Sequence, residues 1–199
     1  MAKLQNEQLG ALQRKLNGII KKIEDGGLDY QRALNGLQAV NDGRGFVRPD
    51  SSEQKMIIRP NRTTSPVYPD WKEELLHPEL ELTGPARYNI SQVEQWLHDG
   101  QKRDKWVKGQ VIYEYLKDNQ MLNSCLSLAD LLAIQAKGIN FFRQHHKGKA
   151  IFGWKSVVRR RDGHLYVPCL CEDGGEVVLD WYWLGGDWYD SDPALRLAS

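Results

Sequence analysis

The chain has 199 residues, of which 41% are hydrophobic and 27% are charged. This balance is typical of a folded globular protein and excludes an intrinsically disordered chain. Its 27 Lys and Arg residues nearly cancel its 26 Asp and Glu residues, which leaves a formal net charge of +1. The chain as a whole therefore has no electrostatic attraction to nucleic acid or to an acidic membrane, and its length predicts one domain with or without a small appendage.

The cysteine count and the N-terminal residues bear on the compartment. Three cysteines cannot form a complete disulfide framework, so we expect reduced thiols. Residues 1–10 (MAKLQNEQLG) are polar and lack the apolar run of a signal peptide. Because no stretch approaches the roughly 18 apolar residues that span a bilayer, we expect a cytoplasmic protein with no membrane span. Export by a route without such a signal stays open.

Residues 1–43 have the pattern of a helical hairpin. Apolar residues recur at spacings of three and four over residues 4–26, which predicts an amphipathic helix that Gly26 and Gly27 end. Asp29 can cap a second helix, which Gly43 ends. The apolar positions are Leu9, Leu12, Leu16, Ile19 and Ile23 in the first helix and Ala33, Leu34, Leu37 and Val40 in the second. Such a hairpin is too small to be stable alone, so it packs on itself or on the main domain, or it is an arm for a partner or for self-association.

Residues 44–70 predict an extended linker. Four prolines break regular structure, and four arginines favour contact with water over contact with phosphate. Residues 56–58 have the composition of one short strand. The residues that define the segment are Pro49, Pro60, Pro66, Pro69, Arg44, Arg48, Arg59 and Arg62.

The main domain is predicted over residues 71–199 and begins with helices. Ser91 followed by Glu94 has the spacing of a capping box and predicts a helix that buries Val93, Trp96 and Leu97. A further helix carries Trp106, Val107, Ile112, Tyr113 and Leu116. Ser127 followed by Asp130 predicts another capped helix, which runs to His146 or Gly148.

Strand patterns come after the helices. Residues 150–158, 165–170, 177–184 and 194–198 are rich in strand formers, and the pairs at 162–163, 174–175 and 185–186 predict turns between them. Pro168 indicates an edge strand or a bulge. Helices before a run of hairpins predict an α+β domain with a largely antiparallel sheet.

Alternation within residues 179–183 predicts two faces of one strand. Leu179, Trp181 and Trp183 share one face, and Asp180 and Tyr182 share the other. Because burial of the tryptophans removes the larger apolar area from water, we expect the tryptophan face in the core and the Asp180 and Tyr182 face in solvent. The alternative is an exposed tryptophan that stacks on carbohydrate.

Charge is segregated along the C-terminal third. Residues 137–161 contain eight Lys or Arg and no acidic residue, whereas residues 162–192 contain eight Asp or Glu and no Lys or Arg. Facing strands with complementary charges explain this pattern, and so does a patch that selects a partner of opposite charge. Asp187, Asp190 and Asp192 lie in a segment of Tyr, Ser, Gly and Asp, a mixture similar to that of antibody loops.

Motifs for catalysis or metal binding are weak. The chain has no nucleotide-binding loop, no G-x-S-x-G elbow and no H-E-x-x-H motif. His145 and His146 are expected at a helix C-terminus, where a protonated ring is favourable. A zinc site from Cys125, His164, Cys169 and Cys171, or a calcium site from Asp180, Asp187, Asp190 and Asp192, is a minor alternative. We therefore expect no enzyme, no metal and no cofactor. An enzyme stays a third hypothesis, with a pocket that joins His98, His164 or the cysteines to an acid.

Residues 89–199 resemble a set of uncharacterised small bacterial proteins. The resemblance is carried by residues 96–99 (WLHD), 131–138 (LLAIQAKG), 153–158 (GWKSVV), 166–168 (YVP) and 193–199 (PALRLAS). Members of that set keep the tryptophans and the ending. They differ at the positions of Asp180, Tyr182, Gly186, Asp187, Tyr189, Asp190 and Ser191.

This distribution resembles the variable end of target proteins of diversity-generating retroelements. In those systems a reverse transcriptase copies a template with errors at adenines, which converts Asn codons into Asp, Tyr, Ser, Gly, Cys and His codons. The resemblance implies a C-type-lectin-like fold, in which two helices precede short strands and residues 194–197 form the closing strand. The paired cysteines of animal C-type lectins and the Glu-Pro-Asn or Gln-Pro-Asp sugar motifs are absent, so the resemblance does not imply calcium-dependent sugar binding.

The leading hypothesis is a non-enzymatic protein that binds a macromolecule through its C-terminal surface. Tyr182 and Tyr189 would be its anchors, and Asp180, Asp187, Asp190 and Asp192 would set its charge preference, with Gly186 and Ser191 between them. The helical hairpin would attach this binder to something else. The alternative is a nucleic-acid-binding or regulatory protein that uses residues 143–161, with Arg159, Arg160 and Arg161 toward phosphate.

Overall fold

The computed structural model describes residues 6–26, 29–31, 34, 38 and 56–197. The chain divides into two compact units, Met1–Ser52 and Glu53–Ser199. This division differs from the predicted segments 1–43, 44–70 and 71–199, because residues 53–70 belong to the C-terminal unit. Ile58 is 0% exposed and joins a core of that unit.

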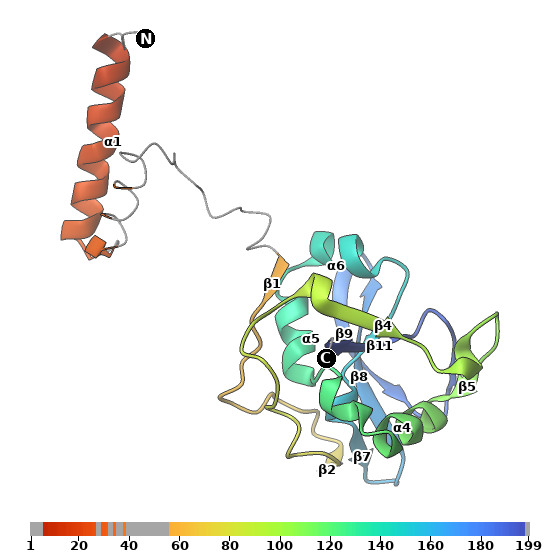
Figure 1. Cartoon of the computed structure of the whole chain (residues 1–199). Coiled ribbons are helices and arrows are strands. Elements are labelled where there is room, and N and C mark those ends of the chain that lie inside the picture. Colours follow the sequence, from red (N-terminus) through yellow and green to blue (C-terminus); the bar gives the residue numbers. More distant parts are fainter. Residues whose placement is uncertain (1–5, 27–28, 32–33, 35–37, 39–55, 198–199) are drawn as a thin grey trace. The chain divides into compact units, whose positions relative to one another are not determined.

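The N-terminal unit contains α1 (Asn6–Glu24), which confirms the helix predicted over residues 4–26 (Figure 1). The helix ends where Gly26 takes a φ of +70° and donates its N–H to the carbonyl of Ile23. On its predicted apolar stripe Leu16, Ile19 and Ile23 are half-buried; the side chains of Leu9 and Leu12 lie outside the described residues. In the second predicted helix, Tyr30, Gln31, Leu34 and Gln38 have helical backbone. Ala33, Leu37, Val40 and Gly43 lie outside the described residues.

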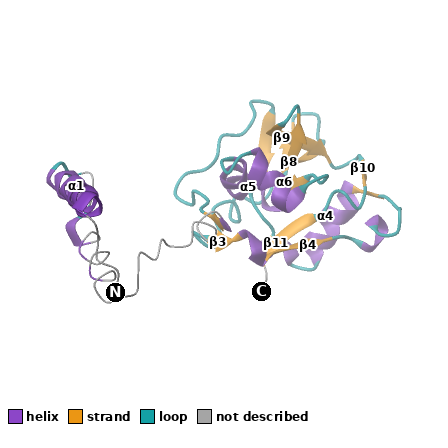
Figure 2. Ribbon diagram, turned by 90° about the horizontal axis from the view of Figure 1, so that it is seen from above, coloured by secondary structure: helices purple, strands orange, loops and turns teal. Residues whose placement is uncertain are grey.

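The C-terminal unit is an α+β domain around a seven-stranded, largely antiparallel sheet (Figures 1 and 2). The strand order is β2-β7-β8-β6-β11-β4, and β9 pairs with β8. Two small sheets, β1-β3 and β10-β5, flank it. The strands are β1 (Ile57–Ile58), β2 (Lys72–Leu75), β3 (Tyr88–Asn89), β4 (Val93–Trp96), β5 (Val107–Lys108), β6 (Ile151–Phe152), β7 (Val158–Arg160), β8 (Leu165–Asp173), β9 (Glu176–Trp183), β10 (Asp187–Trp188) and β11 (Ala194–Leu197).

The turn chemistry at the two central hairpins confirms the prediction. Gly174 and Gly175 have φ values of +56° and +82°, and Asp173 pairs with Glu176 across them. Two positive φ angles in a two-residue loop match the twist of the flanking strands. Gly163, at φ +84°, donates its N–H to the carbonyl of Arg160 and joins β7 to β8. The strand predicted over residues 150–158 is divided into β6 and β7 by a 3-10 turn, Trp154–Ser156.

Pro168 lies in a central strand, so the expected edge strand or bulge is wrong. β8 pairs with β9 on one side and with β6 and β7 on the other. Gly153 donates its N–H to the Pro168 carbonyl at 2.9 Å, which places the proline backbone beside the break between β6 and β7. The missing N–H of proline costs nothing there, because the turn Trp154–Ser156 interrupts the ladder at that position.

The helix predicted from Ser91 is wrong, because this segment forms a short turn and then β4. Asn89 caps the 3-10 turn Ile90–Gln92, and the backbone is extended again at Val93. All four residues of β4 then pair with β11 in antiparallel register, from Val93 opposite Leu197 to Trp96 opposite Ala194. The interstrand ladder, formed with a segment about 100 residues away, outweighs a local capping signal.

Three helices pack on the sheet. The structure has α4 (Gly109–Asp118), α5 (Leu128–Gln135) and α6 (Ile139–His146). The capping box of Ser127 and Asp130 at α5 is confirmed. The single helix predicted from there to His146 is two helices, because Gly138 between them has a φ of +81°. Trp106 and Val107 precede α4 instead of lying within it.

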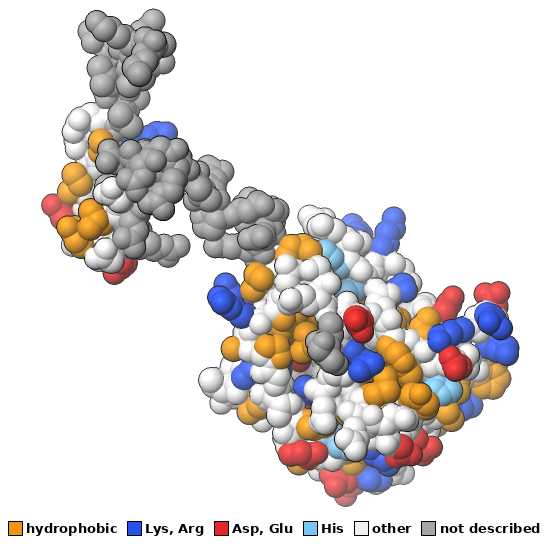
Figure 3. Space-filling model, in the orientation of Figure 1, with side chains coloured by type: hydrophobic (Ala, Val, Ile, Leu, Met, Phe, Trp, Pro, Cys, Tyr) orange, Lys and Arg blue, Asp and Glu red, His pale blue; other side chains and the backbone are white. Residues whose placement is uncertain are grey.

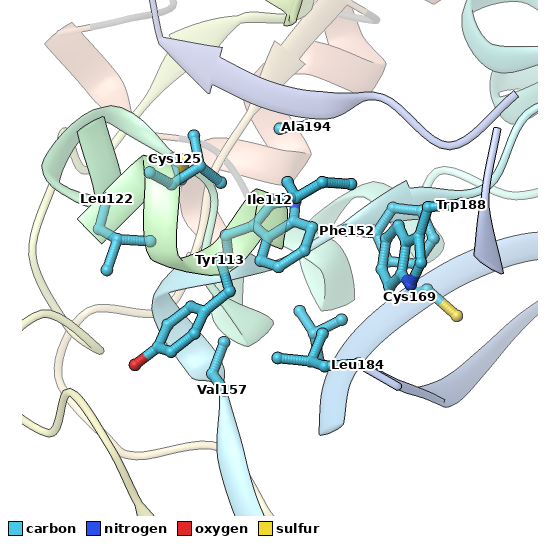
Figure 4. Packing of buried hydrophobic residues seen from close by; sticks show 13 residues of the cluster. Ile112, Tyr113, Leu122, Cys125, Phe152, Val157, Cys169, Leu184, Trp188 and Ala194 are labelled. Carbon is cyan, nitrogen blue, oxygen red and sulfur yellow. The ribbon is translucent and has the colours of Figure 1, made fainter. Parts of the chain in front are cut away.

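Two apolar clusters fill the domain. One joins α4 to the sheet through Ile112, Leu116, Phe152, Trp154 and Trp188, of which the two tryptophans are 0% exposed (Figure 4). The other joins α5 and α6 to residues of β1, β8 and β11, with Leu131, Phe142 and Leu170 at 0% exposure. In β8, Val167 and Cys169 belong to the first cluster and Leu170 to the second, so this strand carries apolar side chains on both faces.

Candidate ligand-binding surface

The two faces of β9 are not divided as predicted. Trp183, expected in the core, is 45% exposed, and Trp181 is half-buried against Trp71 and Tyr68 at centroid distances of 5.6 and 5.7 Å. Tyr182, expected in solvent, is 40% exposed and sets its ring at 88° to that of buried Trp188, 5.0 Å away. The segment before β2 covers one face of β9 and the β10 segment covers the other, which alternation within one strand does not reveal.

The segment after β9 is held to the domain through its backbone. Gly109 donates its N–H to the Gly186 carbonyl at 3.3 Å, and Ala150 donates to the Ser191 carbonyl at 3.1 Å. The amide of Gln101, which is 1% exposed, donates to the carbonyls of Tyr189 and Asp192 at 2.8 and 3.0 Å. These bonds do not depend on the side chains at residues 186, 189 or 191.

Side chains from this segment reach the surface. Tyr189 is 47% exposed and Asp190 is exposed. Asp187 pairs with the ammonium of Lys108 at 2.6 Å, and Ser191 is half-buried. Asp180, on β9, is exposed and accepts the N–H of Trp181 at 2.7 Å. The structure therefore brings aromatic and acidic side chains of β9, β10 and the adjoining loop to one surface.

The side chain of Asp192 bonds to the backbone of its own loop. Its carboxylate accepts the N–H of Tyr189 at 2.8 Å, which closes the loop between the two residues. Burial of the carboxyl raises the pKa of Asp192 above its usual range. Of the eight predicted binding residues, this one holds the loop in shape through its side chain.

The glycines of this segment differ in the room around them. A Cβ at Gly185 would overlap the indole of Trp183, whereas a Cβ at Gly186 would meet only the Trp183 carbonyl at 3.2 Å and the Tyr182 ring at 3.6 Å. A side chain larger than hydrogen therefore fits at Gly186 with a small adjustment, whereas at Gly185 it requires the Trp183 ring to move.

Two residues of this surface, Trp106 and Lys108, were not predicted from the sequence. β5 pairs with β10, with Lys108 opposite Asp187 and Val107 opposite Trp188. Trp106 is 53% exposed, and the Lys108 ammonium lies 5.3 Å from its ring centroid. The sequence signal was the alternation Trp-Val-Lys, which predicts a strand when it is not assigned to the helix after it.

A further aromatic group lies between β4 and α4. The rings of Trp96 and Tyr115 are stacked at 5.4 Å and 23°, and the ring of His98 meets Tyr115 edge-on at 5.2 Å. Figure 3 shows hydrophobic side chains gathered between these two elements. His98, a candidate for an enzyme pocket, instead accepts the N–H of Gly100 through Nδ1 at 3.0 Å and caps the 3-10 turn Asp99–Gln101.

A cluster of ionisable side chains around Arg62, Glu81 and Asp130 is buried, and it was not predicted from the sequence. Arg62, predicted to lie in solvent, pairs with Asp130 at 2.6 Å, and their side chains are 11% and 1% exposed. The hydroxyl of Ser156 donates to Glu81 and accepts the N–H of Leu128 at 2.7 Å. Burial raises the pKa of Glu81. Ser156 and Asp130 are 0% exposed, and the network ties residues 62–81 to α5.

Three arginines of the basic segment, residues 143–161, form ion pairs within the domain. Arg159 pairs with Glu74 at 2.9 Å, and Arg160 pairs with Asp162 at 3.5 Å. Arg161 is exposed. Arg143 of α6 pairs with Glu172 of β8 at 2.5 Å, which joins the basic and acidic segments through a helix and a strand.

Burial also shifts the pKa values of His146 and Cys169. His146 lies at the C-terminus of α6, as expected, but it is 4% exposed, and burial lowers its pKa to about 4. Burial raises the pKa of Cys169 to about 12, which favours the thiol over the thiolate. Across the described part of the chain, no three or more His, Cys, Asp and Glu residues are grouped in a way that would hold a metal ion.

The described residues contain no helix with the length and apolar character needed to cross a membrane. No protein-family model matches the chain, and neither curated proteins nor solved structures match it.

Proposed function

We propose that this chain is a non-enzymatic binding protein whose C-terminal surface recognises a macromolecular partner. The observation that carries the proposal is the anchoring of residues 186–192 through backbone carbonyls by Gln101, Gly109 and Ala150. A loop held in this way keeps its shape when its side chains other than that of Asp192 change. This separation between a fixed frame and changeable contacts is required of an adaptable binding surface.

The space around the two glycines of this segment supports the proposal that the surface is diversified. Gly186, one of the positions that differ in the resembling proteins, accepts a Cβ, whereas Gly185, which is not one of them, lies under the Trp183 ring. Tyr182, Tyr189 and Asp190 are exposed. We therefore propose that the retroelement-type variable segment and its C-type-lectin-like architecture apply here, with β11 as the closing strand beside β4.

The chemistry of the surface indicates how it would bind. Tyr182, Tyr189 and Trp106 are aromatic side chains between 40% and 53% exposed, and aromatic side chains dominate binding energy at interfaces. Asp180 and Asp190 add exposed carboxylates, which would favour a basic partner. The N-terminal helical unit would attach this binder to a further component.

A display library tests the proposal. Codons 186, 187, 189, 190 and 191 are randomised in the full chain, and clones are selected against hen lysozyme as a model protein. We expect folded clones that bind lysozyme and lose binding when Tyr182 or the residue selected at position 189 is replaced by alanine. A matched library at buried positions Leu184 and Trp188 should yield few folded clones, because both are at most 1% exposed. If both libraries fold equally poorly, the segment is not a changeable surface and the proposal fails.

The DNA around the gene provides a second test. A near-copy of the segment that encodes residues 169–199, with differences confined to adenines and a reverse transcriptase gene nearby, would establish diversification. Differences spread over all bases would contradict it.

A further inference from the structure

A groove on the outer side of α5 joins an apolar hollow to a cationic one. The apolar hollow has a volume of about 340 Å³ and is lined by Pro66, Val67 and Leu132, among others. The cationic hollow has a volume of about 380 Å³ and is lined by Lys137 among others. Arg59 and Ala133 line both hollows, so the two lie next to each other. We call this the α5 groove.

The apolar part of the α5 groove is open to solvent. Val67 is 91% exposed and Leu132 is 37% exposed. Alanines line the α5 side of the groove, which leaves space for side chains of another molecule. An isolated exposed valine is ordinary, but a valine, a proline and a leucine around one hollow form a surface that gains from being covered.

The charge of the α5 groove has one sign. Arg59 and Lys137 line it, and none of the described residues that line either hollow is an Asp or a Glu. Partial burial, together with the charge of Arg59, lowers the pKa of Lys137. Two cations that face one hollow repel each other, and a carboxylate between them removes this repulsion.

The α5 groove lies away from the proposed binding surface. In Figures 1 and 2, α5 lies on one side of the domain and β5 or its partner β10 on the other. Figure 3 shows Lys or Arg side chains beside hydrophobic ones over β1 and α5. A molecule in the α5 groove would therefore leave Tyr182 and Tyr189 free.

We propose that the α5 groove binds a peptide segment of a partner protein in which acidic residues flank apolar ones. A glutamate or aspartate of the peptide lies between Arg59 and Lys137, and an adjacent apolar side chain fills the hollow lined by Pro66, Val67 and Leu132. Charge complementarity selects the acidic residue, and the neighbouring hollow selects an apolar residue beside it. The domain is thereby a two-ended adaptor, with a fixed docking groove at one end.

Titration monitored by NMR tests this proposal on the full ¹⁵N-labelled chain. The probe is a capped six-residue peptide with two glutamates flanking two leucines. We expect it to shift the amide signals of Arg59 and of residues 129–137. Replacing its glutamates by glutamines should weaken binding about tenfold, which corresponds to the loss of two exposed ion pairs. Replacing its leucines by serines should weaken it by at least as much, since the apolar hollow is then left uncovered.

Variants of the protein provide the matched comparison. The double variant Arg59→Gln/Lys137→Gln should lose about tenfold in affinity for the glutamate peptide and nothing for the glutamine peptide. Arg87→Gln, which removes an exposed cation outside the α5 groove, should leave the affinity unchanged. Because all three altered side chains are exposed, the spectra should show an unchanged fold.

Three results would overturn the proposal. The first is the absence of shifts along α5 at millimolar peptide. The second is equal binding of the glutamate and glutamine peptides. The third is binding to phosphatidylglycerol vesicles through the same residues without binding to the peptide, which would assign the α5 groove to a membrane surface. None of these results bears on the C-terminal surface, so the two proposals fail independently.

Discussion

Replacing Arg62 by methionine tests the interpretation of the buried polar network as structural. The Arg62 guanidinium lies 2.6 Å from the Asp130 carboxylate and 3.1 Å from the Ser127 hydroxyl, and the two charged side chains are 11% and 1% exposed. Methionine keeps the aliphatic stem of arginine and leaves the carboxylate of Asp130 buried without its cation. Breaking a buried pair on one side costs about 3–5 kcal/mol.

The lower end of that range applies here. Asp130 also accepts the N–H and the hydroxyl of Ser127, at 2.8 and 3.0 Å, and these bonds partly stabilise the charge after Arg62 is removed. We therefore expect Arg62→Met to lower the free energy of unfolding by about 3 kcal/mol, which lowers the melting temperature by roughly 6–12 °C. Urea unfolding monitored by tryptophan fluorescence measures the change.

A double-mutant cycle separates the pair from other effects. Asp130→Asn removes the charge while keeping a side-chain oxygen for Ser127, and the double variant should cost at least about 1.5 kcal/mol less than the sum of the single variants. Arg161→Met is the control, because that exposed arginine should change stability by no more than about 0.5 kcal/mol. If Arg62→Met matches this control, Arg62 belongs to a solvated linker and the reasoning is refuted.

Three further predictions concern pH, packing and the loop. Burial lowers the pKa of His146 to about 4 from 6.5, so the unfolded chain binds the proton first. The stabilisation of the folded state by neutral His146 is complete above pH 6.5, and it declines by up to about 3 kcal/mol as the pH falls toward 4. His146→Leu should therefore flatten the dependence of the free energy of unfolding on pH in this range. An unchanged slope would contradict the assignment. Gly109→Ala would drive a Cβ into the Trp188 indole and should lower the free energy of unfolding by about 1–3 kcal/mol. Gly186→Ala should lower it by less than about 1 kcal/mol. Equal melting temperatures of the two variants would contradict this difference in packing. Gln101→Leu leaves the carbonyls of Tyr189 and Asp192 without their buried donor, so hydrogen exchange should rise in residues 186–192 while β8 stays protected. Uniform exchange across both segments would indicate that Gln101 does not hold this loop.

The sequence was sufficient to predict those elements whose conformation depends on residues close together in the chain. The α+β class, α1, the capped start of α5 and the turns at Gly163, Gly174 and Gly175 follow from periodicity, capping and glycine φ angles. These features depend on hydrogen bonds between residues only a few positions apart. The surface position of Tyr189 and Asp190 was also predictable, because a short Gly-rich polar segment between strands lies at the surface.

Only the tertiary structure decided features in which distant segments meet. Residues 93–96 form a strand because β11 supplies a ladder, although the local sequence predicts a helix. Trp183 is exposed and Tyr182 packs on Trp188 because both faces of β9 are partly covered by other segments. Trp106 and Lys108 join the proposed binding surface through pairing of β5 with β10, about 80 residues further along the chain. Arg62 is buried because Asp130, on α5, compensates its charge. In each case the free energy comes from contacts between residues far apart in sequence, and a pattern read along one segment does not contain its partner.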